Sequence, residues 1–125
     1  MGVTCREDIR QRAFRFTCQL FDYCEDLARN PGMARRVAYQ LFDAGSSIGA
    51  NLQEARAAYS RRDFAAKNAI SLKEARESKY WLRLADAKGL GDRGQCRRLL
   101  QESDEFVAML TKSVKRLQAG SESQP

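Results

Sequence analysis

The residues best suited to chemistry are the basic side chains between residues 60 and 88. This stretch holds eight basic and four acidic residues, and a helix with ~100° per residue would sort them by sign. The cations share one side of that helix and are called the basic arc here: Arg61, Arg62, Lys73, Arg76, Lys79 and Arg83. Because Arg76, Lys79 and Arg83 are one turn apart in succession, all three could contact one phosphate backbone. Tyr80 lies in the same arc and could stack on a base. The alternatives are a solvated face or ion pairs with a neighbouring helix.

Several classes of enzyme chemistry are excluded by residue type. The chain has no histidine, which rules out Ser–His and Cys–His nucleophile pairs and zinc sites with histidine ligands. The four cysteines, Cys5, Cys18, Cys24 and Cys96, form no C-x-x-C pair. Cys18 and Cys24 would be ~9 Å apart along one helix, which is too far for a disulfide. We therefore predict free thiols in a reducing cytoplasm, and no catalytic residue, metal or cofactor.

Two polar residues beside the apolar side of a predicted helix are candidates for acid–base catalysis. Asn51 and Glu54 lie inside or beside the apolar line of residues 31–56. General acid–base catalysis needs a second group and a pocket, and the sequence indicates neither. An unpaired buried carboxylate is costly, so we expect Glu54 to pair with a lysine or arginine of a neighbouring helix. The glycines of residues 89–94 follow no strand, which indicates a turn and not a phosphate-binding loop.

Length and composition predict one soluble domain. The 125 residues are 43% hydrophobic and 30% charged, with a net charge of +6 and a pI near 9.4. No apolar run approaches the ~18 residues of a membrane span, and no secretory leader is visible. We expect a domain over residues 1–118, a flexible polar tail over residues 119–125, a cytoplasmic location and no membrane partner.

Helices are the elements that must position these side chains. Apolar residues recur at alternating spacings of four and three, which is typical of helices in a bundle. The predicted helices cover residues 7–29, 31–56, 60–88 and 92–118. Asn30 and Ser60 are predicted N-caps, with Pro31 in the first position of its helix. The short connections predict an all-α, antiparallel up-down-up-down four-helix bundle.

Two further features concern packing. A run of small residues predicts close helix contacts at Gly45, Ser46, Ser47, Gly49 and Ala50. Aromatic and aliphatic residues also lie off the core stripe of two helices: Phe14, Phe21, Ile70, Tyr80, Trp81 and Leu84. Extra apolar surface on two helices indicates a second buried surface and hence self-association. The alternative is a wide core that buries these positions in a monomer.

The motifs together resemble one bacterial family of four-helix bundles. Residues 46–51 read Ser-Ser-Ile-Gly-Ala-Asn, residues 60–64 read Ser-Arg-Arg-Asp-Phe, and residues 77–82 read Glu-Ser-Lys-Tyr-Trp-Leu. This pattern, with Glu54, resembles the proteins encoded by intervening sequences of 23S ribosomal RNA genes. It also resembles the accessory variability proteins of diversity-generating retroelements. The resemblance covers about residues 8–118.

The resemblance implies a homopentameric barrel with a basic surface. Retroelement members bind nucleic acid and a reverse transcriptase and support mutagenic retrohoming, whereas the intervening-sequence members have no settled activity. The latter usually read Ile-Ala-Glu-Gly after Asn51, where this chain has Leu-Gln-Glu-Ala, and the start at Ser60 is more similar to the retroelement branch. We therefore predict a non-enzymatic oligomer that binds RNA or DNA and a reverse transcriptase. The rival is a structural scaffold that docks a protein or ribosomal RNA without a reverse transcriptase.

Overall fold

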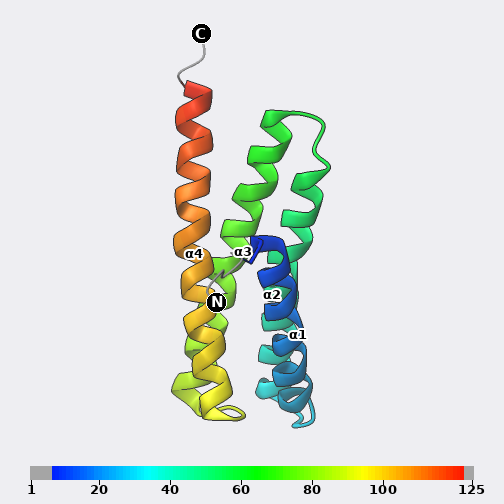
Figure 1. Cartoon of the computed structure of the whole chain (residues 1–125). Helices are drawn as coiled ribbons and strands as arrows, with labels where there is room; N and C mark the ends of the chain where they lie inside the picture. Colours follow the sequence, from blue (N-terminus) through cyan, green and yellow to red (C-terminus); the bar gives the residue numbers. More distant parts are fainter. Residues whose placement is uncertain (1–6, 123–125) are drawn as a thin grey trace, which may run out of the picture.

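Four antiparallel α-helices make up residues 7–122, the part of the chain that this computed structural model describes. They are α1 (Ile9–Ala28), α2 (Met33–Arg56), α3 (Arg61–Lys88) and α4 (Arg93–Glu122). Each helix packs along the next one in the chain, and α1 and α4 come together over a shorter stretch (Figure 1). The predicted all-α four-helix bundle is confirmed, and no strand occurs within these residues.

Local capping explains where α1 and α3 begin. The Asp8 carboxylate accepts a hydrogen bond from the Arg10 backbone N–H at 2.8 Å, and the Arg10 side chain lowers the pKa of Asp8 to about 2. As predicted, Ser60 caps α3, because its hydroxyl accepts a hydrogen bond from the Asp63 N–H at 3.1 Å. These caps satisfy backbone donors that have no partner inside the helix.

The predicted start of α2 and end of α4 are wrong. Asn30 does not cap α2, and Pro31 is not its first residue, because both lie in the turn that precedes Gly32. Gly32 has a φ of 102°, a conformation that favours glycine. The predicted tail at residues 119–122 is helical, since a lone Gly120 weakens a helix without removing a backbone donor. Residues 123–125 lie outside the described part.

The small residues of α2 let α1 approach closely. An added Cβ at Gly45 would lie 2.1 Å from Leu20 Cδ2, and one at Gly49 would lie 3.3 Å from Ala13 Cβ. The predicted close contact is therefore confirmed at these two glycines. Ser46 and Ser47 are half-buried. Ala50 is exposed, so the predicted close helix contact is wrong at Ala50.

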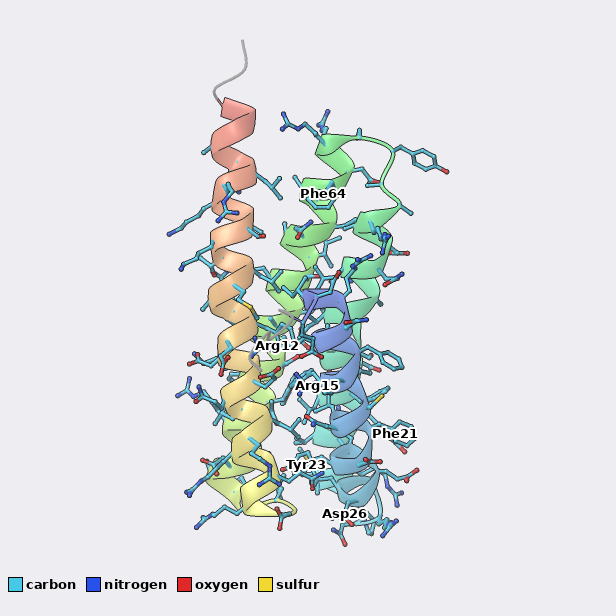
Figure 2. All side chains as sticks on the ribbon, viewed as in Figure 1. Arg12, Arg15, Phe21, Tyr23, Asp26 and Phe64 are labelled. Carbon is cyan, nitrogen blue, oxygen red and sulfur yellow. The ribbon has the colours of Figure 1, made fainter. Side chains whose placement is uncertain are left out.

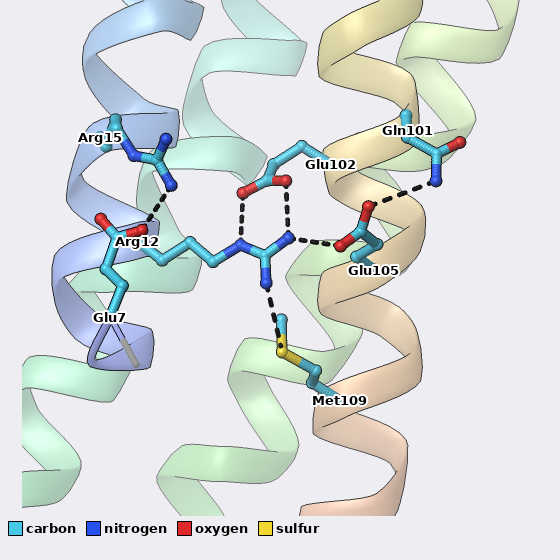
Figure 3. Close-up of polar contacts among 7 residues, drawn as sticks. All are labelled: Glu7, Arg12, Arg15, Gln101, Glu102, Glu105 and Met109. Atoms are coloured by element: carbon cyan, nitrogen blue, oxygen red, sulfur yellow. Dashed lines mark hydrogen bonds and ion pairs between the residues drawn. The ribbon is translucent and has the colours of Figure 1, made fainter. Parts of the chain in front are cut away.

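Arg12 ties α1 to α4 (Figure 3). Its guanidinium donates to both carboxylate oxygens of Glu102, at 2.6 and 2.8 Å, and to Glu105 at 2.5 Å. It also lies 5.6 Å from the centre of the Phe106 ring. A planar fork that meets a carboxylate at two points is a strong and directional contact. The pKa of Glu105 is lowered by the same hydrogen bond.

The core thins toward the end of the bundle that α1 does not reach. Near this end Phe64 is 39% exposed, and Val114 and Leu117 are only half-buried. The reason is the short first helix: α1 begins beside the middle of α4, so α3 and α4 continue past it without a fourth helix (Figure 1).

Among residues 7–122, none of the helices combines the length and the apolar character that crossing a membrane requires.

Two cysteines are buried as free thiols, which leads to a prediction about reactivity. Cys24 and Cys96 lie in the core, and burial raises the pKa of Cys24 to about 12 from a usual 9. The thiolate fraction is then about a thousandfold lower than in the unfolded chain. In a Cys5→Ser/Cys18→Ser variant we expect an aromatic disulfide reagent at pH 8 to leave both thiols unmodified until denaturant is added. Rapid modification of the native protein would contradict this burial.

Candidate nucleic-acid interface

The structure places most of the basic arc on exposed surface of α3. Arg61 and Arg62 begin the helix at the end that α1 does not reach. The middle cations, Lys73, Arg76 and Arg83, are exposed, and no ion pair holds them within the described residues. Their spacing of three and seven spreads them over ~80° of one side of the helix and ~15 Å of its length. The arc is therefore two groups of cations on one rigid helix and not one continuous patch.

Lys79 differs from the other members of the arc. Its ammonium group contacts the Asp104 carboxylate of α4 at 2.7 Å and is half-buried. Ion pairing with a neighbouring helix was the alternative for the whole arc, and it holds for this one residue. Because Asp104 already pairs with the charge of Lys79, we expect Lys79 to attract a phosphate less strongly than Arg76 or Arg83 does.

Beside Lys79, a hollow of about 430 Å³ lies on the surface between α3 and α4. Its lining combines both signs of charge with apolar surface: Lys79, Arg83, Asp86, Arg97, Leu100, Gln101 and Asp104. Asp86 forms an ion pair with Arg97, with 3.4 Å between Oδ1 and Nε, so both acidic groups at the hollow are paired. Arg83 and Arg97 approach it from different helices. Sequence reasoning missed Asp104 here, because its position beside Lys79 depends on the register between α3 and α4.

The other edge of α3 is acidic, as the helical arithmetic predicted. Glu77 accepts a hydrogen bond from the Trp81 indole N–H at 3.3 Å. Burial, together with the nearby Glu77 charge, raises the pKa of Glu74.

Tyr80 is exposed and packs edge-on against Trp81, with ring centroids 5.3 Å apart. An exposed ring next to the cations is suited to stacking on a base.

Asn51 and Glu54 have structural partners. Lys67 contacts Glu54 at 3.4 Å, which confirms the predicted pairing with a neighbouring helix, although Glu54 is exposed and not in the core. The Asn51 side-chain amide donates to the Ser47 carbonyl at 2.9 Å. The described residues contain no group of three Cys, Asp or Glu side chains placed to hold a metal ion.

A second candidate surface lies on the outer side of α1 and α2 and is called the aromatic face. Phe14 and Phe21 are 70% and 50% exposed (Phe21 is labelled in Figure 2), and Phe42 packs edge-on against Phe21 at 5.9 Å. A hollow of about 350 Å³ beside Phe14 includes Gly49 and Ala50 in its lining.

A wide monomer core was the alternative for these apolar positions, and it is wrong for Phe14 and Phe21 of α1, since neither is buried. On α3 the off-stripe residues divide. Ile70 and Tyr80 are exposed, whereas Trp81 and Leu84 are half-buried. The exposed off-stripe residues are therefore Phe14 and Phe21 on the aromatic face, and Ile70 and Tyr80 on α3.

Comparisons with known proteins agree with the fold. The model of the 23S rRNA-intervening sequence protein family matches residues 6–112. The crystal structure of a protein with unknown function from the S23 ribosomal protein family of Bacteroides thetaiotaomicron is similar, with a TM-score of 0.78 and 30% identity. That match covers 86% of this chain and 99% of the other. A search of the curated proteins finds no match. Neither match is to a retroelement protein, so the closer likeness to that branch has no support. This chain belongs to the family of 23S rRNA-intervening sequence proteins.

Proposed function

We propose that this protein is a non-enzymatic accessory protein that binds nucleic acid through the basic arc of α3. The observation that supports this most is the row of exposed cations at Lys73, Arg76 and Arg83, none of which forms an ion pair with a side chain of the described part. A rigid helix fixes the spacing of these side chains, and contacts with phosphates read no sequence. The net charge of +6 adds a general attraction to polyanions.

The salt dependence of binding tests this proposal. Fluorescence anisotropy with labelled RNA and DNA of equal length should show binding at ~50 mM salt, little preference for sequence, and a steep loss of affinity as salt rises. Each phosphate contact contributes ~0.7–0.9 to the slope of log K against log salt. If the wild type binds neither nucleic acid at low salt, the protein-docking scaffold becomes the better explanation.

Self-association through the aromatic face is the second part of the proposal. A homopentameric barrel is the predicted assembly, and repetition of the arc in an oligomer would multiply its contacts. Light scattering at micromolar concentration should give several times 14.2 kDa. Phe14→Gln combined with Phe21→Gln should reduce the mass to that of one chain, because the exposed rings carry the apolar area. A wild type that is monomeric at every concentration would contradict this part.

The reverse transcriptase stays a predicted partner. With a reverse transcriptase as its partner, the protein would hold template RNA or cDNA near the polymerase. The family match supports the rival just as well, a scaffold that docks ribosomal RNA or a protein. Gene neighbourhood distinguishes the two: a reverse transcriptase gene beside a repeated variable region favours the first, and an interrupted 23S rRNA gene favours the second.

A further inference from the structure

Among residues 7–122, one end of the bundle has three helices where the other has four, and it is called the open end here. It consists of the last turn of α2, the first two turns of α3, and α4 from Met109 onward. Figure 1 shows α3 and α4 continuing past the point where α1 begins, and Figure 2 places Phe64 in this region. An amphipathic segment in line with α1 would complete the bundle at this end.

A groove of about 350 Å³ lies at the open end. Its apolar residues come from three helices: Ile9, Leu52, Ala55 and Phe64. Polar side chains complete the lining: Arg10, Arg56, Asn68 and Ser113. The Asn68 side-chain amide already donates a hydrogen bond to the Phe64 carbonyl at 2.8 Å. The groove therefore has an apolar floor and cations at its edge.

The charge on α4 reverses where α1 begins. The row of α4 that faces α1 contains Glu102, Glu105 and Met109, and all three contact Arg12. At the same helical spacing this row continues to Lys112 and Arg116. A helix that extended the line of α1 would therefore meet cations, where α1 itself meets carboxylates.

The cations of the open end are available to a partner. Six of them form no ion pair with another described side chain: Arg56, Arg61, Arg62, Lys112, Lys115 and Arg116. Two nearby acids are already held, since Glu54 contacts Lys67 and Asp8 contacts Arg10. The local excess of positive charge selects for an anionic occupant.

We propose that the open end binds an acidic, amphipathic helix of a partner protein, in line with α1. Its apolar side would cover Phe64 and Leu52, and its carboxylates would face Arg56, Lys112 and Arg116. An apolar floor gives no advantage to a sugar–phosphate chain. The α1 helix of a second copy is not complementary either, since its first two turns carry three arginines. This site is separate from the middle of α3 and does not depend on nucleic-acid binding.

Peptide binding with charge exchange tests the proposal. The probe is a fluorescent three-heptad peptide with leucine at two positions per heptad and glutamate beside them. We expect Lys112→Glu combined with Arg116→Glu to weaken its binding by roughly tenfold in anisotropy titrations. The same peptide with lysine in place of glutamate should bind the variant better than it binds the wild type. Lys88→Glu combined with Arg93→Glu makes the same change of charge on exposed surface near the opposite end of the bundle; it is the matched control and should have a small effect.

Three results would overturn the proposal. One is equal binding of a scrambled peptide with the same composition. Another is an RNA oligonucleotide that loses affinity for the double variant while the peptide binds neither protein, which would assign the groove to nucleic acid. The third is a loss of self-association in the double variant without peptide binding by the wild type, which would assign the groove to a second copy. Circular dichroism of each variant distinguishes these results from unfolding. Both substitutions lie on exposed surface, so we expect the helix content to stay the same.

Discussion

Replacing Arg76, Lys79 and Arg83 together by glutamine should lower the slope of log K against log salt by roughly 1.4–1.8 for each occupied protomer. The expected drop is two and not three contacts because Asp104 already holds Lys79 at 2.7 Å. Affinity for RNA or DNA should fall steeply at low salt, where contacts with phosphate are strongest. Titrations at several salt concentrations measure both quantities, with helix content and mass checked in parallel.

The control for this triple variant removes the same charge elsewhere. Arg36, Lys88 and Arg93 are exposed near the opposite end of the bundle, and their replacement by glutamine should change the slope much less. Asp104→Asn should have the opposite effect, because it releases Lys79 for a phosphate. A triple arc variant that stays folded and binds as tightly as the wild type would place the site elsewhere, with Arg97 and Arg98 as the next candidates.

The basic arc was predictable because its members lie on one helix. Positions such as Arg76 and Arg83 are related by a fixed rotation per residue, so the sequence alone determines that they share a side. Whether a cation is free depends on the neighbouring helix. The contact of Lys79 with Asp104 crosses 25 residues and requires the register of α3 against α4. The spacing rule carries no information about that register.

The helices were predictable for a similar reason, and their ends were not. The alternating four-and-three spacing is local, and so is the Ser60 cap. The start of α2 was misplaced because Asn30 and Gly32 both suit a helix boundary, and the φ of 102° at Gly32 arises only in the folded turn. The link from Arg12 to Glu102 joins the first helix to the last, so no sequence window contains it. The thin core at Phe64 likewise follows from the different lengths of α1 and α4.

Gly45→Leu should lower the free energy of unfolding more than any other substitution of a helical glycine discussed here. A Cβ at this position already overlaps Leu20 Cδ2 at 2.1 Å and lies 3.4 Å from the Phe16 ring. Both neighbours are fully buried, so the added atoms have no space without a shift of α1. Overpacking of this kind costs about 1–3 kcal/mol or more. Thermal unfolding followed by circular dichroism should show a melting temperature lower by about 5–15 °C.

Two further glycines on helices give a graded comparison. Gly49→Leu should cost less than Gly45→Leu, within about 1–3 kcal/mol, because Gly49 is half-buried and its nearest neighbour is Ala13 Cβ at 3.3 Å. Gly94→Leu is the control: Gly94 is exposed on α4, and an added Cβ meets only Arg98 and Asp92 side chains at 3.4 Å. Leucine there should raise the melting temperature slightly, because it is a better helix former than glycine by up to ~1 kcal/mol. Equal melting temperatures for all three variants would mean that α1 and α2 do not pack through this seam, since only a close contact makes the cost depend on position.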